Sequence, residues 1–319
     1  MTASIHIHTL QEAPERQPTY LAVGSFDGVH KGHQALLQAM IARAKQDNVR
    51  TAVLTFFPHP KRVVARQTGR YYITTLADRI ELLAQQGVDL IITHPFDETV
   101  QHTRAADFMQ QLVTYLDLRQ LWGGNFALGY QREGDIPYLR RLGRSLGYTV
   151  ELVDALTLHK GKRVSSSRIR RAMAEGDMET VNGCLGRPYH LEGVVVKGDQ
   201  RGRTIGFPTA NLSVWEELLL PTNGVYAAIA VVDGESFMAA TNIGTRPTVD
   251  GRSVVVEPHL LDFSGDLYGR TLRLHFYHRV RPEKKFDSLE ALKKQIARDV
   301  QTTRQILQED SSAAANYHT

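Results

Sequence analysis

Short apolar runs alternate with amphipathic segments through the first half of the chain. The runs have the length of strands, and between them apolar residues recur every three or four positions, which is the spacing of one helix face. We expect strands over 20–26, 50–56, 88–93, 120–123 and 148–153, and helices near 33–46, 75–86, 104–116 and 137–146. Short apolar strands that are buried on both faces and alternate with helices predict a parallel, Rossmann-like α/β sheet.

Several residues mark the ends of these predicted helices. Thr75 and Asp78 form a capping-box pattern at the start of the second helix, and Pro137 suits the first turn of the fourth. Gly87 and Gly147 follow helices and can adopt the left-handed backbone conformation that ends them. The boundaries therefore support the periodicity.

Beyond about residue 186 the pattern changes. Runs rich in Val, Ile, Thr and aromatic residues are separated by turn signals such as Asp233-Gly234 and Asp250-Gly251. The runs are 193–197, 225–232, 237–243, 253–256 and 271–277. They predict an antiparallel β-barrel or sandwich.

One long helix is expected to close this second part. It runs from Ser288 to about Leu307, and its apolar face is formed by Leu289, Leu292, Ile296, Val300 and Leu307. The tail after Gln308 is expected to be disordered. We predict two domains, residues 18–184 and 185–308, joined through a helical segment over 167–184.

Composition narrows the class of protein. The 319 residues carry a formal net charge of +4, which suits an anionic nucleotide substrate but is too small to indicate DNA or RNA binding. Cys184 is the single cysteine, so an intrachain disulfide and a cysteine-based zinc site are both excluded. The sequence shows neither a signal-peptide core nor an apolar run of about 18 residues, and we expect a cytoplasmic protein without a membrane partner.

The segment after the first predicted strand carries residues suited to phosphate. It reads Gly-Ser-Phe-Asp-Gly-Val-His-Lys-Gly-His over 24–33 and leads into a helix. The first turn of a helix has unpaired N–H groups and a partial positive charge, so a glycine-rich strand-to-helix turn is a natural phosphate site. His30 and His33 can donate hydrogen bonds to phosphate oxygens, and Gly32 permits close approach of a ligand to the backbone. Taken alone, the two histidines are equally compatible with a structural role.

The second half carries polar residues that a plain barrel does not need. Thr209 and Asn211 flank Ala210, so on an extended chain their oxygens point the same way and suit Mg²⁺. Glu257 lies among apolar residues, where a carboxylate can act as a general base. Neither a P-loop nor a dinucleotide-binding glycine motif occurs in this half.

Eight motifs in order resemble the prokaryotic bifunctional riboflavin kinase/FMN adenylyltransferase family, also called FAD synthetase. The resemblance covers about residues 18–308. The motifs are Gly28-Val-His-Lys-Gly-His33, Thr55-Phe-Phe-Pro-His-Pro60, Asn125-Phe-Ala-Leu-Gly129 with Arg132-Glu-Gly-Asp135, Ser165-Ser-Ser-Arg-Ile-Arg170, Gly206-Phe-Pro-Thr-Ala-Asn211, Leu220-Pro-Thr-Asn-Gly-Val-Tyr226, Asn242-Ile-Gly-Thr-Arg-Pro-Thr248 and Val256-Glu-Pro-His-Leu-Leu-Asp-Phe263.

For the first half, the resemblance implies transfer of an adenylyl group from ATP to FMN, with release of pyrophosphate. His30, His33 and Arg168 would be the catalytic, phosphate-holding residues. The implied nucleotide- and flavin-binding residues are Gly24, Phe26, Asp27, Gly28, Gly32, Asn125, Asp135, Ser165, Ser166 and Ser167. For His59, a role in shaping its loop and a functional role are equally compatible with the sequence.

For the second half, the resemblance implies phosphorylation of riboflavin by ATP and Mg²⁺. Thr209 and Asn211 would hold the metal and ATP, Gly206 and Pro208 would line the nucleotide site, and Glu257 would be the base. The sequence departs from the family pattern at Phe57, Trp122, Leu128 and Pro258. Because proline cannot donate to a sheet ladder, Pro258 predicts that Glu257 lies at the end or edge of a strand.

Two other functions compete with this interpretation. One is a nucleotidyltransferase for another phosphate acceptor with the barrel as an accessory domain, and the motifs around Thr209 and Glu257 count against it. The other is a non-catalytic RNA-binding protein, suggested by a basic isoelectric point of about 9.1. No ladder of aromatic residues interleaved with Lys and Arg supports RNA binding, so we expect riboflavin, FMN and ATP as partners and no nucleic acid.

Overall fold

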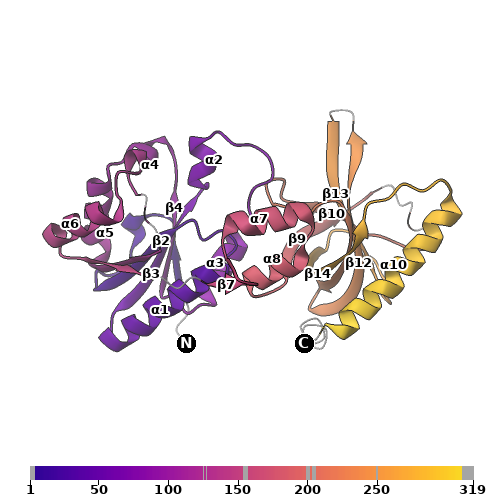
Figure 1. Cartoon of the computed structure of the whole chain (residues 1–319), viewed down its shortest axis with the longest axis horizontal. Helices are drawn as coiled ribbons and strands as arrows, with labels where there is room; N and C mark the ends of the chain where they lie inside the picture. Colours follow the sequence, from indigo (N-terminus) through magenta and orange to yellow (C-terminus); the bar gives the residue numbers. More distant parts are fainter. Residues whose placement is uncertain are drawn as a thin grey trace. The chain divides into compact units, whose positions relative to one another are not determined.

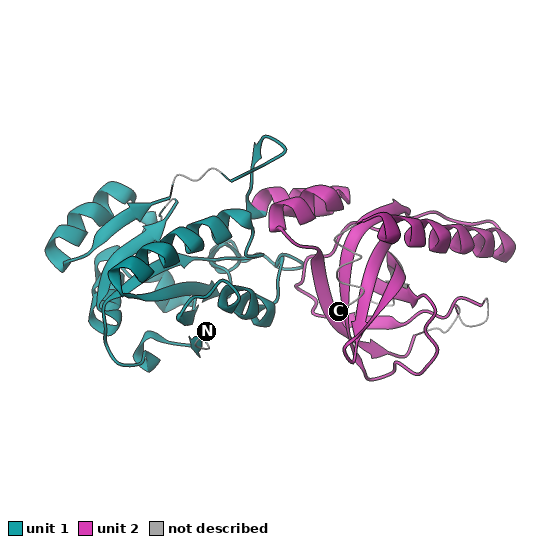
Figure 2. Ribbon diagram, turned by 90° about the horizontal axis from the view of Figure 1, so that it is seen from below, with its two compact units in different colours: residues 1–166 teal, residues 167–319 magenta. Residues whose placement is uncertain are grey.

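A computed structural model describes residues 4–124, 126, 128–153, 157–198, 202, 206–248 and 251–310, with the backbone alone at 246–248 and 251–253. The chain divides into two compact units, residues 1–166 and 167–319 (Figure 2). This division falls before the predicted linking segment, which therefore belongs to the second unit. The functional boundary at 184/185 stays a prediction.

The first unit is built on a parallel sheet, as the sequence predicts (Figure 1). Within the described residues it has six strands in the order β1-β4-β3-β2-β5-β6, and every neighbouring pair is parallel. The strands are β1 (Ile5–Ile7), β2 (Thr19–Gly24), β3 (Arg50–Phe57), β4 (Leu90–Pro95), β5 (Leu118–Gly123) and β6 (Thr149–Leu152). Strand β1 lies before residue 18, where the predicted first domain begins. It was not predicted, because three residues are too few to show the alternation of apolar and polar positions that marks a strand.

Helices cover both faces of this sheet and bury two separate apolar clusters. Leu37 and Met40 of α1 and Leu83 of α3 pack on one face, whereas Phe108 and Leu112 of α5 pack on the other. The helices are α1 (Lys31–Asp47), α2 (Pro60–Val64), α3 (Leu76–Ala84), α4 (Glu98–His102), α5 (Ala105–Leu116) and α6 (Ile136–Leu146). All four predicted helices are confirmed, and α2 and α4 are too short to be found by periodicity.

The predicted helix ends are confirmed. The Asp78 N–H donates to Thr75 Oγ1 over 3.1 Å, and Thr75 Oγ1 donates to Asp78 Oδ2 over 2.6 Å. Pro137 lies in the first turn of α6, and Gly147 ends that helix with φ of 81°. Local chemistry therefore determines where these helices begin and end.

The second unit opens with two helices instead of one continuous segment. Helix α7 (Ser166–Glu175) ends before Gly176, whose φ of 75° is a left-handed conformation that glycine adopts at little cost. Asp177 is the N-cap residue of α8 (Met178–Leu185). Asn182 of α8 donates to the carbonyl of Phe276 over 2.9 Å and accepts from the N–H of Tyr189 over 2.8 Å. These bonds attach α8 to the barrel that follows.

The rest of this unit is a closed antiparallel barrel with strand order β10-β13-β12-β11-β14-β9 among the described residues. The strands are β9 (Tyr189–Val196), β10 (Asn211–Val214), β11 (Gly224–Val232), β12 (Glu235–Thr248), β13 (Gly251–Leu260) and β14 (Thr271–Pro282). Asp233 and Gly234 form the predicted hairpin turn, with φ of 50° and 84°. Asp250 lies outside the described residues, and β10 was not predicted.

Helix α10 (Leu289–Glu309) packs its carboxyl-terminal half on the outer face of the barrel. Its predicted apolar face is wrong at the start, because Leu289 is 56% exposed. The buried face contains Asp299 and Thr303 together with Leu307. Asp299 is buried because Arg281 of β14 donates to both its carboxylate oxygens, over 2.8–3.0 Å. A polar residue in such an ion pair cannot be found from hydrophobic spacing.

Candidate active sites in the two units

The turn between β2 and α1 is held in an unusual backbone conformation. Phe26, Gly28 and Val29 have positive φ of 46°, 85° and 37°. A side chain at Gly28 would lie 3.0 Å from Ile73, and the buried ring of Phe26 packs on Gly24 and His33. Because positive φ is costly for residues with side chains, the surrounding structure must enforce it.

The carboxylate of Asp27 supplies much of that support. Asp27 is 1% exposed and accepts hydrogen bonds from the N–H groups of Ile73 and Thr74 over 3.0 and 3.2 Å. Arg79 of α3, which is 0% exposed, lies 3.7 Å from it and donates to Thr55 Oγ1 over 3.2 Å. The predicted binding residue Asp27 therefore fixes the turn through its side chain.

Two stacked histidines occupy the start of α1. His30 is the N-cap residue, and its Nδ1 accepts from the N–H of His33 over 3.3 Å, so a neutral His30 carries its proton on Nε2. The two ring centroids are 3.6 Å apart with 13° between the planes. Gly32 permits this, since its Cβ position would lie 3.2 Å from the His30 ring. The strand–turn–helix junction is thus as the sequence predicts.

Protonation of His33 is disfavoured at this position. Burial, followed by the neighbouring His30 and Arg79, holds the pKa of His33 well below its usual value of 6.5. Its Nδ1 is buried without a hydrogen-bond partner among the described residues. The ring is therefore neutral near pH 7 and presents one N–H donor instead of a positive charge.

This pKa shift predicts how stability depends on pH. Below about pH 6.5 the unfolded chain takes up a proton at His33 that the folded chain does not bind, so the free energy of unfolding falls as the pH decreases. Urea unfolding at pH 7.5 and 5.5 measures this decrease, which we expect to be smaller in His33→Gln. An equal decrease in both proteins would contradict the shift.

The serine-rich motif lies beside the same turn although it is far away in the sequence. Ser166 Oγ donates to the carbonyl of Asp27 over 3.1 Å, across 139 positions of the chain. Ser165, half-buried, directly precedes α7, and Ser167 and Arg168 lie in its first turn. The structure therefore brings the start of the serine motif to the histidine motif.

The remaining predicted residues of the first unit have other surroundings. Asn125 lies outside the described residues. Asp135 is exposed and caps α6, where its Oδ1 accepts from the N–H of Tyr138 over 2.8 Å. His59 caps α2, and its backbone N–H donates to the Tyr72 hydroxyl over 2.9 Å. The side chains of Asp135 and His59 thus each cap a helix, and the binding role of Asp135 stays a prediction.

In the barrel, Thr209 and Asn211 both lie against a glycine-containing segment. A Cβ atom at Gly198 would lie 2.3 Å from the Asn211 amide, and one at Gly202 would lie 3.1 Å from Thr209 Oγ1. Thr209 is exposed, Asn211 is half-buried, and Ala210 between them is buried. The two oxygen-bearing side chains are therefore on one side, as alternation predicts.

Glu257 was expected at the end or the edge of a strand, and the end is wrong, because Glu257 lies inside β13. At Pro258 the strand does have an edge, because the neighbouring β10 begins only at Asn211. Glu257 pairs across the ladder with Asn242 of β12, whose Nδ2 donates to Glu257 Oε2 over 3.3 Å. The Pro258 carbonyl accepts from the N–H of Ala210, which precedes β10, over 3.0 Å. The proline nitrogen faces the same side, where no ladder bond is required, so the strand continues through Pro258.

A cavity of about 400 Å³ lies beside these residues. It is bounded by Thr209 and Pro208 on one side and by Leu260 and Phe263 on another. The Pro208 carbonyl is 2.7 Å from His259 Nδ1, and Gly206 has φ of 84°. The remaining wall is formed by Val195, Ala210, Pro258 and residues 264–268.

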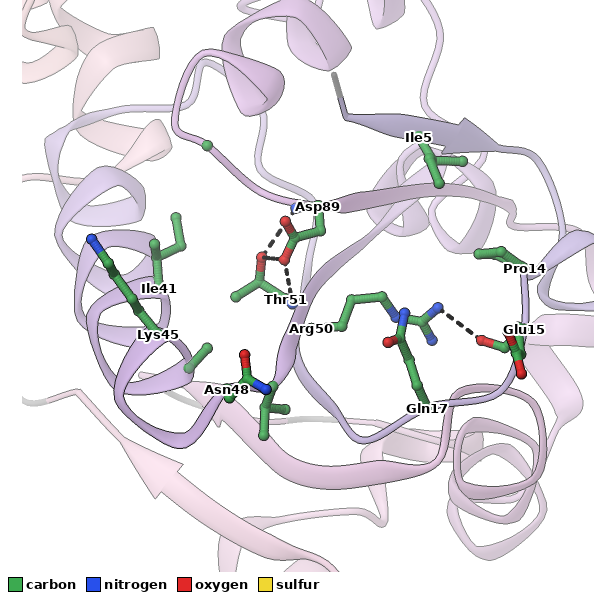
Figure 3. A pocket seen from close by; sticks show the side chains of 13 residues that line it. Ile5, Pro14, Glu15, Gln17, Ile41, Lys45, Asn48, Arg50, Thr51 and Asp89 are labelled. Atoms are coloured by element: carbon green, nitrogen blue, oxygen red, sulfur yellow. Dashed lines mark hydrogen bonds between the residues drawn. The ribbon is translucent and has the colours of Figure 1, made fainter. Parts of the chain in front are cut away.

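A second cavity, of about 640 Å³, lies in the first unit away from all the predicted site residues (Figure 3). It opens at the amino ends of β3 and β4, where Arg50 donates to Thr19 Oγ1 and the Glu15 carbonyl. The positive charges of Lys45 and Arg50 in its lining are balanced by the negative charges of Glu15 and Asp89. This edge is opposite to the one where parallel sheets bind ligands, and its charges balance.

Sequence reasoning missed two residues that organise these sites, Arg79 and Asn242. Arg79 lies one helical turn before buried Leu83, so the two side chains share a face of α3. A basic residue on an apolar helix face was therefore the signal in the sequence that Arg79 is buried and paired with an acidic group. Asn242 belongs to a motif quoted above, but its pairing with Glu257 depends on the register of β12 and β13. Such register cannot be read without the hairpin geometry.

Two family models match this chain, one in each half. The family described as FAD synthetase matches residues 12–168, and the family described as riboflavin kinase matches residues 185–307. A crystal structure described as a macrolide-efflux protein from Streptococcus pneumoniae is 28% identical, with a TM-score of 0.85 over 95% of this chain and 99% of that one.

Among the helices that the structure describes, none has both the length and the apolar character that crossing a membrane requires.

Curated relatives match almost the whole chain. The bifunctional riboflavin kinase/FMN adenylyltransferase of Escherichia coli K12 is 38% identical over 302 residues, which cover 94% of this chain and 96% of that protein. The protein of the same name from Bacillus subtilis 168 is 35% identical over 308 residues, 93% of this chain and 96% of the relative. The resemblance found in the motifs is therefore confirmed, and the chain belongs to the family of bifunctional riboflavin kinases/FMN adenylyltransferases.

Proposed function

We propose that the two reactions of this enzyme use separate groups, one set around His33 and the other around Glu257. The enzyme phosphorylates riboflavin in its carboxyl-terminal half and adenylylates FMN in its amino-terminal half, with ATP as the substrate of both. The observation that carries the proposal is the presence of two independent polar sites, one around His33 and one around Glu257. Incubation with riboflavin and Mg·ATP, followed by separation of riboflavin, FMN and FAD, tests it.

In the first unit, the start of α1 holds the phosphates of ATP. The Nε2–H of His30, the remaining ring N–H of His33 and the N–H groups of the first helical turn donate to phosphate oxygens. The FMN phosphate attacks the α-phosphorus of ATP, FAD forms and pyrophosphate leaves. Positioning and neutralisation of the developing charge supply most of such catalysis. Arg168, through its planar guanidinium, is assigned to the same phosphates.

In the barrel, Glu257 accepts the proton of the riboflavin 5′-hydroxyl while the oxygen attacks the γ-phosphorus and ADP leaves. The cavity beside Thr209 is assigned to the base of ATP, because Leu260 and Phe263 offer it an apolar wall. Asn242 positions the Glu257 carboxylate through the hydrogen bond to Oε2. Pro258, the residue of β13 that follows Glu257, lines this cavity.

Thr209 and Asn211 are assigned as the residues that hold Mg²⁺ together with ATP phosphates. Mg²⁺ prefers oxygen ligands, which the Thr209 hydroxyl and the Asn211 amide supply, and Gly198 and Gly202 let the chain approach these side chains closely. The ion would neutralise charge on the transferred phosphoryl group. The single cysteine and the use of ATP support the cytoplasm as the place of action.

Asn211→Ala tests this assignment. We expect FMN formation to require a higher Mg²⁺ concentration for half-maximal rate, because one oxygen ligand is lost. FAD formation from added FMN by the same variant is the internal control and should respond to Mg²⁺ as in the wild type. An unchanged Mg²⁺ requirement for FMN formation would contradict the role of Asn211.

The limits of the kinase fragment provide a further prediction. A fragment over residues 167–310 keeps the bonds of Asn182 to Phe276 and Tyr189, and we expect it to fold and to phosphorylate riboflavin. A fragment over 185–308 lacks Asn182 and so loses both hydrogen bonds, each of which contributes about 0.5–1.5 kcal/mol to stability. Urea unfolding should therefore show the shorter fragment to be less stable. A folded longer fragment without kinase activity would refute independent catalysis by the second unit.

A further inference from the structure

The outer face of the barrel carries two neighbouring rows of side chains around Glu257. Ladder pairing places Glu257, Asn242, Val225 and Arg281 in one row, from β13 across β12 and β11 to β14. The adjacent row contains Gly244 of β12, which pairs with Val255. Because paired residues share a face of the sheet, the side chains of both rows point to the same side as the Glu257 carboxylate.

Glu283, just beyond β14, extends the second row with a carboxylate. Asn223 Nδ2 donates to Glu283 Oε2 over 2.9 Å and is also 3.3 Å from Thr245 Oγ1. The other oxygen, Oε1, has no hydrogen-bond partner among the described residues. It lies above Gly244, 2.9 Å from the position that a Cβ atom would take there.

Asn242 faces the same gap from the other side. Its Nδ2, which donates to Glu257, lies 3.3 Å from the same Cβ position of Gly244. The missing side chain of Gly244 thus leaves a space bounded by the Glu283 carboxylate and by the amide that orients Glu257. Glu283 is exposed, so the space is accessible from solvent.

We propose that Glu283, held by Asn223 above Gly244, binds a secondary hydroxyl of the acceptor's polyol chain and so determines specificity for a polyhydroxy acceptor. This inference rests on the assignment of Glu257 as the base that receives the proton of the terminal hydroxyl. The hydroxyls next to that terminal group must then lie along the same face of the barrel. A carboxylate oxygen accepts a hydrogen bond from a hydroxyl strongly, because the bond is charge-assisted.

The anchoring of Glu283 suits a residue that must select a ligand. Arg281, two positions earlier, is fixed by both carboxylate oxygens of buried Asp299 in α10. Asn223 then sets the orientation of the carboxylate itself. The backbone before Glu283 is held through Arg281, and the carboxylate itself is held by Asn223. The carboxylate therefore loses little conformational freedom when a substrate binds, which favours discrimination between similar acceptors.

The test compares riboflavin with analogues in which one ribityl hydroxyl is replaced by hydrogen. For the wild type we expect kcat/KM for one such analogue to be about 10- to 100-fold lower than for riboflavin, since the carboxylate loses a charge-assisted hydrogen bond from the missing hydroxyl. Glu283→Gln should raise the KM for riboflavin and reduce that discrimination to a few-fold. The KM for ATP and the formation of FAD from FMN should not change.

Two further variants make the result decisive. Glu235→Gln changes an exposed carboxylate at the start of β12 and should discriminate as the wild type does. Gly244→Ala fills the gap and should raise the KM for riboflavin, which keeps the proposal testable if Glu283→Gln fails to fold. Wild-type discrimination in a folded Glu283→Gln variant, or an unchanged KM in Gly244→Ala, overturns the inference.

The experiment distinguishes a failure of the role of Glu283 from a failure of the assignment of Glu257 as the base. If Glu257→Gln retains kinase activity, the acceptor site is elsewhere and the underlying assignment fails. If Glu257→Gln is inactive while Glu283→Gln still discriminates fully, only the role of Glu283 fails. A purely structural role of Glu283 would lower stability in urea without changing the preference among the analogues.

Discussion

We expect the His33→Ala variant, supplied with riboflavin and Mg·ATP, to accumulate FMN and to form almost no FAD. The variant loses a ring N–H donor at the start of α1 and the ring that stacks on His30 at 3.6 Å. Removal of one preorganised donor to a developing negative charge lowers a rate by about 10²–10³-fold. Chromatographic separation of the three flavins over time measures the effect.

The kinase should be unaffected by this substitution, because every group assigned to FMN formation lies in the other unit. His102→Ala, on the exposed side of α4, is a matched control in the same unit and should leave both rates unchanged. Loss of both activities from a His33→Ala protein with a wild-type circular dichroism spectrum would contradict the separation of the sites.

Glu257→Gln is expected to have the opposite effect. The amide keeps the size of the side chain but cannot accept the proton of the riboflavin hydroxyl, and loss of a general base lowers a rate by about 10²–10⁴-fold. Conversion of added FMN to FAD should continue at nearly the wild-type rate. Initial rates with riboflavin and with FMN as separate substrates measure the two reactions.

Glu235→Gln serves as the control for this substitution, since Glu235 is an exposed carboxylate on the neighbouring strand β12. It should not change the rate of FMN formation. A Glu257→Gln kinase within a few-fold of the wild type would refute the assignment of the base.

Much of the first unit could be predicted because its strands are continuous apolar runs and its helices have local capping residues. Thr75, Pro137 and Gly147 each act within a few positions of the chain, so their effects are visible in the sequence. The strand β1 is different, since Ile5 to Ile7 form a strand only by pairing with β4 more than 80 positions away. Local patterns carry no information on such pairing.

The candidate sites show the same division. His30 and His33 were predicted as a pair because a strand-to-helix turn is a local feature, and the structure stacks them. The contact of Ser166 with Asp27, the burial of Arg79 and the pairing of Asn242 with Glu257 all depend on the tertiary fold. Pro258 predicted either the end or the edge of a strand, and only the end is wrong. The edge arises because β10 begins after Ala210, the residue that faces Pro258, and the start of a neighbouring strand cannot be read from one strand.

Mixing the two variants, each of which lacks one of the two reactions, tests the central claim of two separate sites most directly. His33→Ala and Glu257→Gln are combined in equal amounts with riboflavin and Mg·ATP, and FAD is measured over time. The account predicts that FMN made by the first variant is converted to FAD by the second, although each variant alone forms almost none from riboflavin. Failure of the mixture to form FAD, while each folded variant retains its own expected reaction, would mean that FMN does not pass through solution between the sites. Loss of both reactions in either folded variant would contradict separate sites altogether.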